Sequence, residues 1–311
     1  MYGITLTVAA CLRSGTRADI AWLVEADGLS ITDWSDAVVF TPGGGRIGTL
    51  AGGALDGQLT DLAGRWSSGR LVDLEVSEID ALIAGLPSGG SARGLLVPAT
   101  VIPTDMWDLA STRQPVCLVC RTEGNEVVDI SLFTEDRIVE AGAVAEQLFA
   151  SGTSGSTIVD GAVITVFRAV PRLVVVGNSP VADALSELAA KVGWRTQAFT
   201  EAASATGAIA ALSKLDKVVV TGHDLELTGG ALGAALDSEA GYIGSLGSHR
   251  MQQNRADWLA YRGVTDLTRV HGPAGIDIGA ETPAEIAISI LAEAIALAST
   301  DKQEKGVVRD A

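Results

Sequence analysis

From Pro171 onward the chain alternates short apolar runs with helix-like segments. The first run, residues 173–176, is apolar throughout, which is typical of a strand buried on both faces of a parallel sheet. Repeated strand–helix units with short loops indicate right-handed βαβ connections and a doubly wound sheet. We therefore predict a Rossmann-like α/β domain over residues 171–298, with strands at 173–176, 195–199, 217–220 and 241–243 and helices at 181–192, 203–212, 231–236 and 249–261.

The first half of the chain is instead rich in strands and glycine turns. Strands are predicted at 19–25, 37–40, 46–50, 71–76, 93–97, 116–121 and 127–132, and residues 158–167 fold back around a turn at Asp160-Gly161. Helices are predicted at 56–66 and 143–150. This order indicates an α+β domain over residues 1–170, because strands and hairpins outnumber the helices. The change of pattern places the domain boundary near residues 168–172.

The end of the second domain carries a helix-start signal. Thr282 suits the N-cap of a helix, Pro283 its first position and Glu285 the third position of a capping box. Residues 299–311 are polar and charged, and we expect them to form a disordered tail.

The charge of the chain excludes several classes of function. Among 311 residues, 22 are Lys or Arg and 38 are Asp or Glu, a net charge of -16. Such a surface repels phosphate backbones and anionic lipids, so binding to nucleic acid or to a membrane surface is not expected. No apolar run reaches the ~18 residues of a membrane span, and the start of the chain does not resemble a signal peptide. The expected location is the cytoplasm.

Net charge also differs between the two halves. Residues 1–170 carry -11 and contain no lysine, whereas residues 171–311 carry -5. Lys191 is the first lysine, which rules out Schiff-base chemistry in the first domain. Residues 245–270 hold a local excess of arginine, so an anionic ligand is expected on the second domain. The acidic first domain is left as a candidate surface for a protein partner.

The sequence offers no metal site and no catalytic residue. Cys117 and Cys120 match a CxxC spacing, but they lie in a predicted strand, where a separation of three points the two thiols to opposite faces. We therefore interpret them as core thiols. The spacing of Cys and His residues does not suit zinc, and neither a GxSxG turn nor a Walker A motif is present.

The first βα turn of the second domain partly matches a dinucleotide-binding fingerprint. Gly177 and Ala182 suit its first and third positions, but Ser179 takes the middle one and Pro180 follows it. Glu201, beyond the next strand, is a candidate for a ribose hydroxyl. Two interpretations stay open here: a nucleotide or pterin-phosphate site, and a merely tight turn.

Two further turns follow predicted strands at the same edge. They are residues 221–224 and 244–250, and ligands of open α/β sheets bind beyond the carboxyl ends of the strands. Arg250 is a candidate anion clamp. His223 and His271 are either site residues or hydrogen-bonded structural imidazoles, and for His249 the structural interpretation is preferred. In the first domain, the glycine turns at 51–57 and 85–90 have two interpretations: they bring backbone amides to a ligand, or they are turns that pack a small barrel.

Three of these segments resemble one protein family. Residues 221–224 (TGHD), 242–250 (YIGSLGSHR) and especially 271–293, which begin His271-Gly-Pro-Ala-Gly-Ile-Asp-Ile-Gly, are similar to the XdhC/CoxI family. The resemblance covers residues 10–298 and is strongest after 218. It implies an N-terminal XdhC/CoxI domain followed by a Rossmann domain, in agreement with the boundary above.

The family resemblance implies a maturation role. Members bind molybdenum cofactor and deliver it to a molybdenum hydroxylase of the xanthine dehydrogenase or carbon monoxide dehydrogenase type, with a cysteine desulfurase and a homodimer as further partners. The cargo here would be molybdopterin or its cytidine dinucleotide, held between the two domains. The implied binding residues are Gly52, Gly53, Ser88, Gly89, Gly177, Asn178, Ser179, Thr221, Gly222, His223, Asp224, Gly244, Leu246, Gly247, Ser248, Arg250, His271, Gly272 and Asp277.

The sequence departs from the family at two positions. Where members carry thiols in the first domain, this chain has Ala54 and Ser88, and neither replaces a soft thiolate ligand. Two alternatives therefore stand beside the maturation role. One is an NAD(P)-binding Rossmann oxidoreductase, and the other is a paralogue that scaffolds partner assembly without binding a cofactor.

Overall fold

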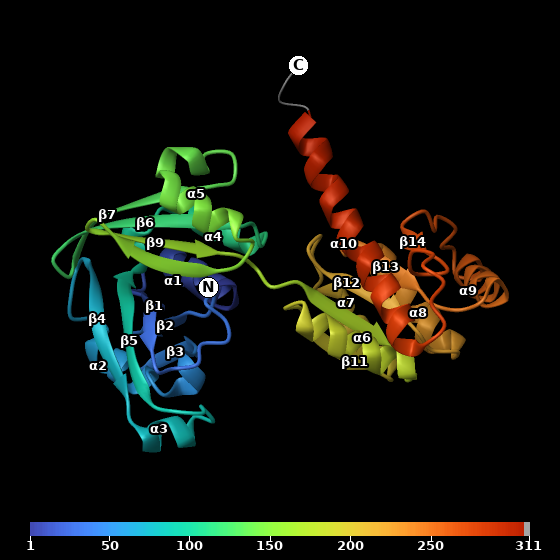
Figure 1. Cartoon of the computed structure of the whole chain (residues 1–311), viewed down its shortest axis with the longest axis horizontal. Helices are drawn as coiled ribbons and strands as arrows, with labels where there is room; N and C mark the ends of the chain where they lie inside the picture. Colours follow the sequence, from blue (N-terminus) through green and yellow to red (C-terminus); the bar gives the residue numbers. More distant parts are fainter. Residues whose placement is uncertain (308–311) are drawn as a thin grey trace. The chain divides into compact units, whose positions relative to one another are not determined.

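The computed structural model describes the backbone of residues 1–307 and the side chains of residues 1–297. The chain forms two compact units, Met1–Ala169 and Val170–Ala311 (Figure 1). The predicted boundary at 168–172 lies where one unit gives way to the other. Each unit has its own sheet and its own buried core.

The first unit is built on an antiparallel sheet in the order β3-β2-β1-β5-β4-β7-β6-β9-β8. Its strands are β1 (Asp19–Asp27), β2 (Val38–Thr41), β3 (Gly45–Gly48), β4 (Gly69–Val76), β5 (Gly90–Pro98), β6 (Val116–Glu123), β7 (Glu126–Phe133), β8 (Gly155–Val159) and β9 (Ala162–Phe167). The Ser156 hydroxyl on β8 donates to the carbonyl of Leu23 on β1, so the sheet curls until its edge strand β8 approaches β1.

Alternation along the strands divides the core of this unit. On β1, Ile20 and Trp22 belong to the core inside the curl, whereas Ala21 and Leu23 belong to a second cluster on the other face. This is the period of two expected for a sheet covered on both sides. The covering helices are α1 (Thr5–Ser14), α2 (Asp56–Leu62), α3 (Glu78–Ile83), α4 (Asp105–Ser111) and α5 (Ala143–Ala150).

The strands predicted for the first unit are all present, and the structure confirms the α+β fold class. Some boundaries were wrong. The predicted helix at 56–66 ends at Leu62, and the strand predicted at 46–50 ends at Gly48. Helices α1, α3 and α4 were not predicted, because short helices gain most of their stability from tertiary packing rather than from local propensity.

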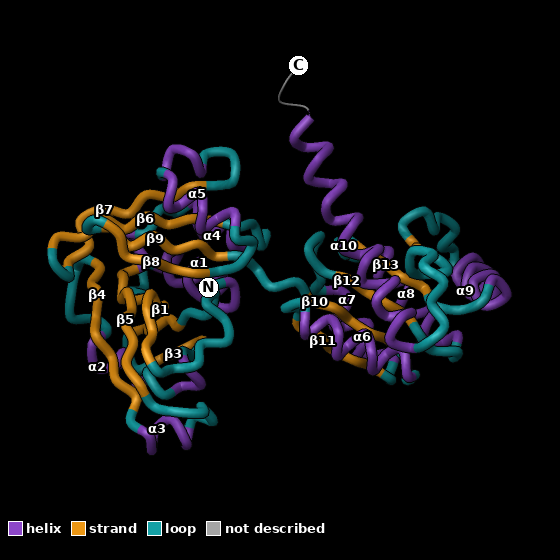
Figure 2. Tube along the Cα trace, in the orientation of Figure 1, coloured by secondary structure: helices purple, strands orange, loops and turns teal. Residues whose placement is uncertain are grey.

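The second unit is a parallel sheet in the order β11-β10-β12-β13-β14. The strands are β10 (Arg172–Val176), β11 (Arg195–Phe199), β12 (Lys217–Val220), β13 (Tyr242–Ser245) and β14 (Val270–His271). Helices α6 (Pro180–Lys191) and α10 (Pro283–Val307) pack on one face of it. The opposite face is covered by α7 (Ala202–Ala210), α8 (Leu225–Asp237) and α9 (His249–Tyr261), and Figure 2 shows the strands between these helices.

Two sequence predictions for this unit need correction. Helix α8 begins at Leu225 rather than at 231, because the Asp224 side chain accepts from the backbone amides of Glu226 and Leu227 and starts the helix there. The disordered tail predicted from 299 is wrong for residues 299–307, which continue α10. No proline interrupts this stretch, and Lys302, Gln303, Glu304 and Lys305 are good helix formers. Residues 308–311 lie outside the described part of the chain.

The capping box predicted at the start of α10 is present. The Thr282 hydroxyl accepts from the amide of Glu285, and the Glu285 carboxylate accepts from the amide of Thr282 at 2.8 Å. These bonds lower the pKa of Glu285.

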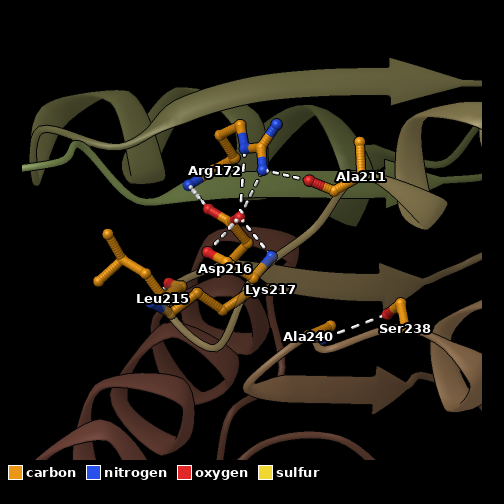
Figure 3. Close-up of polar contacts among 8 residues, drawn as sticks. Arg172, Ala211, Leu215, Asp216, Lys217, Ser238 and Ala240 are labelled. Atoms are coloured by element: carbon orange, nitrogen blue, oxygen red, sulfur yellow. Dashed lines mark hydrogen bonds and ion pairs between the residues drawn. The ribbon is translucent and has the colours of Figure 1, made fainter. Parts of the chain in front are cut away.

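A buried carboxylate joins the strands at the amino edge of this sheet (Figure 3). Asp216, with no exposed surface, precedes β12 and accepts from the backbone amide and the guanidinium of Arg172 at 2.9 and 2.7 Å. It also accepts from the amide and the hydroxyl of Ser213, both at 2.9 Å. The Arg172 guanidinium in turn donates to the carbonyl of Ala211 at 2.6 Å. This cluster stabilises the edge opposite to the predicted ligand site.

Cys117 and Cys120 lie in strand β6 and point to opposite faces, as predicted. Cys117 packs against α5, and Cys120 packs inside the curled sheet. Burial raises the pKa of both thiols to about 12. They are core side chains rather than a redox pair.

The cysteines carry the first testable prediction. Because the folded thiols stay protonated, iodoacetamide at pH 8 should leave Cys117 and Cys120 unmodified in the native chain and label both in urea. The unfolded thiols titrate near pH ~8.5, below the folded value of about 12, so the free energy of unfolding should fall as the pH rises between these values. Mass spectrometry of the peptides reads the labelling, and equal labelling rates with and without urea would contradict the burial.

No helix in the described part of the chain is long and apolar enough to span a membrane.

Candidate functional site

The strand order of the second unit places one switch point in the sheet. The chain runs from β10 outward to β11, then crosses back to β12 on the other side of β10. The turns after β10 and β12 therefore diverge from neighbouring strands at the carboxyl edge, which is where ligands of such sheets bind. The predicted turns after β13 and β14 lie along the same edge.

The turn after β10 is packed closely against the turn after β12. A side chain on Gly177 would lie 2.5 Å from the amide nitrogen of Gly222, and Gly177 has a φ of +118°. Any larger residue would push the two turns apart, so only glycine fits here. The Thr221 amide donates to the carbonyl of Val176 at 2.8 Å and fixes the same approach.

The start of α6 offers few amides to an anion. Pro180, at its first turn, has no N–H, and the Ser179 side chain accepts from the amide of Ala182. The amide of Asp183 donates to the carbonyl of Ser179. In a dinucleotide-binding turn these amides face a pyrophosphate, so the structure does not provide that cradle at α6. Asn178 is exposed beside it.

The start of α8 is capped by a carboxylate. Asp224 holds the amides of Glu226 and Leu227, and His223 beside it is exposed. An anion at this helix start would meet the Asp224 charge. Thr221–Asp224 all lie at the carboxyl edge of the sheet. The Asp224 carboxylate, however, already accepts from two amides of the helix that it caps.

A buried arginine beneath the edge was not singled out by sequence reasoning. Arg255, on α9, is 1% exposed and has no carboxylate partner among the described residues. Its guanidinium donates to the carbonyl of Gly222 at 2.6 Å, the carbonyl of Leu246 at 2.7 Å and the hydroxyl of Ser245 at 2.7 Å. One side chain thus joins the turns after β12 and β13. Burial lowers the pKa of Arg255 to about 10.

Gln252 extends this network to the end of β14. Its side-chain oxygen accepts from the buried hydroxyl of Ser245 at 2.6 Å, and its amide donates to the carbonyls of Ser245 and Gly247. A side chain on Gly272 would collide with Gln252 at 2.9 Å, so the turn after β14 packs on this residue. Arg255 and Gln252 lie three residues apart on α9 and so face the same side of the helix.

The start of α9 is the basic point of the edge. Ser248 caps the helix by accepting from the amide of Met251, and the residues that follow are His249 and Arg250. Both are exposed, and within the part of the chain that the structure describes Arg250 has no hydrogen bond or ion pair. Of the starts of α6, α8 and α9, that of α9 is the one at which a cation lies beside the N-terminal amides.

His271 belongs to a second polar group on the α10 face of the sheet. Its Nδ1 lies 3.3 Å from the Glu293 carboxylate, which also accepts from the Tyr242 hydroxyl at 2.6 Å and from the amide of Gly275 at 2.8 Å. The Tyr242 and His271 rings are 5.1 Å apart, and Tyr242 lies over Gly244. Burial and the bond to Glu293 raise the pKa of Tyr242. The His271 imidazole thus lies between the Tyr242 ring and the Glu293 carboxylate.

Among the predicted site residues of the second unit, Asp277 does not lie at the ends of the strands. It lies in the loop between β14 and α10, exposed, and its carboxylate accepts from the amide of Gly279. That contact shapes a loop turn.

In the first unit, the turn at 51–57 is organised by a buried acid. The Asp56 carboxylate accepts from the Thr49 hydroxyl at 2.8 Å and the Leu50 amide at 3.1 Å, and it lies 3.3 Å from Arg46. Gly53 lies beside this carboxylate. Gly52, with a φ of +63°, would place a side chain 2.6 Å from the carbonyl of Ala84.

The second glycine turn of this unit packs on the end of β4. A side chain on Gly89 would lie 2.6 Å from the carbonyl of Val76, and the Ser88 hydroxyl donates to the carbonyl of Gly28 at 2.8 Å. The structure brings the turns at 51–57 and 85–90 close together, since Gly52 lies against Ala84, the residue before the second turn. A cavity opens between the first of them, Gly85 and the loop before β2.

The described residues contain no group of three or more His, Cys, Asp or Glu side chains that could hold a metal ion.

Comparisons with known proteins find similarity over part of this chain. Residues 173–294 match the XdhC Rossmann domain. The molybdenum cofactor insertion chaperone PaoD of Escherichia coli (strain K12) is 32% identical over 129 residues, which are 41% of this chain and 40% of PaoD. The uncharacterized protein YqeB of the same organism is 43% identical over 65 residues, which are 20% of this chain and 12% of YqeB. The matched segments therefore span less than half of either curated relative.

Among solved structures, one described as a xanthine dehydrogenase from Bacillus halodurans is similar to this chain. It is 19% identical with a TM-score of 0.43, over 95% of this chain and 96% of that one.

Proposed function

Residues 173–294 form an XdhC Rossmann domain, and from this premise we propose that the protein is an accessory factor in the maturation of a molybdenum hydroxylase. It would bind molybdenum cofactor, or a nucleotide form of it, as cargo and deliver it to the client enzyme. The similarity of 129 residues to a molybdenum cofactor insertion chaperone supports this role.

The observation that carries the proposal is the grouping of turns at one sheet edge. Gly177, Thr221–Asp224 and Gly244–Arg250 follow β10, β12 and β13, and Arg255 joins the last two turns from below. A delivery protein needs a site that binds its cargo and also releases it. Exposed turns over a rigid buried network suit this requirement better than an enclosed active site does.

The phosphate of the cargo is best placed at the start of α9. Arg250 supplies an exposed guanidinium, which pairs with phosphate oxygens, and the helix start supplies backbone amides. The starts of α6 and α8 are less suitable, because Pro180 has no N–H and the Asp224 carboxylate would repel a phosphate. Ser248 caps α9 as Ser179 caps α6, so the exposed Arg250 is what distinguishes the start of α9. The start of α6 also argues against a nicotinamide dinucleotide, whose pyrophosphate needs the α6 amides.

The residues present suit the phosphate and pterin parts of the cargo better than its molybdenum atom. Ala54 and Ser88 offer no thiolate, and Cys117 and Cys120 are buried. The molybdenum would therefore gain no soft protein ligand from these positions. We propose that affinity comes from the organic part of the cargo.

Replacing Arg250 by alanine tests the proposed phosphate site. We expect calorimetry to show molybdopterin or its cytidine dinucleotide binding about tenfold more weakly to Arg250→Ala than to the natural chain, since one charge-assisted hydrogen bond is lost. Lys191→Ala is the matched control, because it removes an exposed cation at the far end of α6. Mass spectrometry of small molecules released from the native protein would identify a retained cargo.

Two results would contradict the proposal. One is the absence of heat with both cofactor forms together with no retained small molecule. The other is tight binding of NADH with turnover of a hydride acceptor, which would favour the oxidoreductase. Association with a hydroxylase while no cofactor form binds would point to a scaffold.

A further inference from the structure

Helix α3 of the first unit presents its large apolar side chains to solvent (Figure 1). Ile79, Leu82 and Ile83 are 71%, 79% and 79% exposed, whereas Ala81 is 1% exposed and belongs to the buried core. Residues at positions i, i+3 and i+4 share one side of a helix, so the three form one surface, here called the α3 face. A surface helix normally turns its apolar side toward the core. The arrangement in α3 is the reverse.

The α3 face differs from the other exposed apolar residues of this unit. Leu6 on α1 and Ile47 on β3, for example, are each the one large apolar residue exposed on their element. Apolar residues exposed singly are normal on a protein surface and need no explanation. Three on one turn of helix form a contiguous patch, and such a patch with a polar rim is typical of an interaction surface.

The rim of the α3 face is negative. Glu78 and Asp80 are exposed on either side of Ile79 in the helix. The Asp80 carboxylate accepts from the Ser77 hydroxyl at 2.7 Å, whereas the Glu78 carboxylate has no hydrogen bond or ion pair within the described part of the chain. Residues 71–92 contain four Asp or Glu and no Lys, Arg or His. A partner that covers the apolar centre therefore meets only negative charge around it.

We propose that the α3 face docks the client hydroxylase, through a patch of that enzyme with an apolar centre and a rim of Lys or Arg. The proposal rests on the proposed function, because that function supplies the client. Opposite charges around the contact accelerate association and select the partner.

The charges argue against two other occupants. In a symmetric contact with a second copy of this chain, Glu78 and Asp80 would meet the same acids of the other copy. Residues 1–170 carry -11, which adds to that repulsion. A membrane surface with anionic lipids would be repelled in the same way. A basic protein surface is the occupant that the negative rim favours.

A single introduced thiol tests whether the face is open and whether the client covers it. The three natural cysteines are buried, so a maleimide reports on position 82 alone in Leu82→Cys. In the free full-length chain we expect labelling as fast as in Leu6→Cys, the control on α1. Adding the molybdenum hydroxylase of the same organism, produced without its cofactor, should slow labelling at position 82 about tenfold or more and leave position 6 unchanged.

Substitutions then separate the apolar centre from the charged rim. The double variant Leu82→Ser/Ile83→Ser should bind the hydroxylase about a hundredfold more weakly, since two central apolar side chains are lost, and Leu6→Ser is its control. Glu78→Lys should weaken binding about tenfold at low salt, and the difference should disappear at about 0.5 M salt. Glu146→Lys, on the exposed side of α5, is the charge control. Calorimetry measures the affinities, and circular dichroism verifies the fold of each variant.

Several outcomes would overturn the docking surface. Slow labelling of Leu82→Cys in the free chain would mean that another part of the chain or a second copy already covers the face. The proposal also fails if the hydroxylase does not associate, if Leu82→Ser/Ile83→Ser binds it unchanged, or if the face instead binds phosphatidylcholine vesicles. The maturation role is judged separately, by binding of the cofactor to the natural chain and to Arg250→Ala.

Discussion

Asp216→Ala is expected to lower the free energy of unfolding of the second unit by about 3–4 kcal/mol. The carboxylate has no exposed surface and accepts from two backbone amides, a hydroxyl and the Arg172 guanidinium. Alanine leaves the amides of Arg172 and Ser213 without acceptors and removes the partner of a partly buried cation.

Urea denaturation combined with hydrogen exchange of β10 and β12 measures this effect, since the two units need not unfold together. Glu187→Ala is the control: Glu187 is exposed on α6, and its loss should change stability by less than about 0.5 kcal/mol. The Asp216 cluster lies at the amino edge of the sheet. Cofactor affinity of the folded variant should therefore stay unchanged, and a loss of stability under 1 kcal/mol would contradict the role given to the cluster.

Arg255→Met should act on the opposite edge and change two properties at once. The thioether fills the space but cannot donate to the carbonyls of Gly222 and Leu246 or to the Ser245 hydroxyl. The buried oxygens left without a donor destabilise the fold more than removal of the buried guanidinium stabilises it. We therefore expect the free energy of unfolding to fall by about 2–3 kcal/mol. Cofactor affinity should fall about tenfold or more, because the turns after β12 and β13 are no longer joined.

Arg255→Lys separates the two effects. Lysine keeps the charge but not the fork of donors, so it reaches at most part of the three acceptors. Affinity between those of the natural chain and Arg255→Met would show that the geometry of the turns matters. If Arg255→Met stays folded and binds cofactor as the natural chain does, the arginine is a structural residue without influence on the ligand edge.

The two charged groups show why sequence patterns reach only part of the candidate site. Turn residues such as Gly177 and Ser248 are visible in the sequence, since glycine and helix caps announce where strands end and helices begin. Arg255 and Asp216 are not visible in this way. An arginine on a helix and an aspartate before a strand are usually exposed, and only the packing of other elements over them makes them buried centres.

The cavity in the first unit is a further example. The sequence of residues 30–36 does not predict that they line a cavity, because a loop with Asp, Trp and Ser is ordinary at a protein surface. The cavity forms because this loop packs beside Ala51, Gly52, Gly85 and Leu86, which lie 15 or more residues away in the sequence. Contacts at that separation have no local signature.

The sequence alone determined the α/β class of the second unit, the α+β class of the first, and the family of residues 173–294. These properties follow from local patterns: apolar runs, strand alternation, glycine turns and a long motif near the end. The tertiary structure decided which polar groups are buried and paired, that Ser179, Asp224 and Ser248 cap the starts of α6, α8 and α9, and that a cavity lined in part by Asp33 and Asp36 exists. The physical reason is that burial and hydrogen bonding depend on neighbours supplied by distant segments, and these neighbours exist only once the chain has folded.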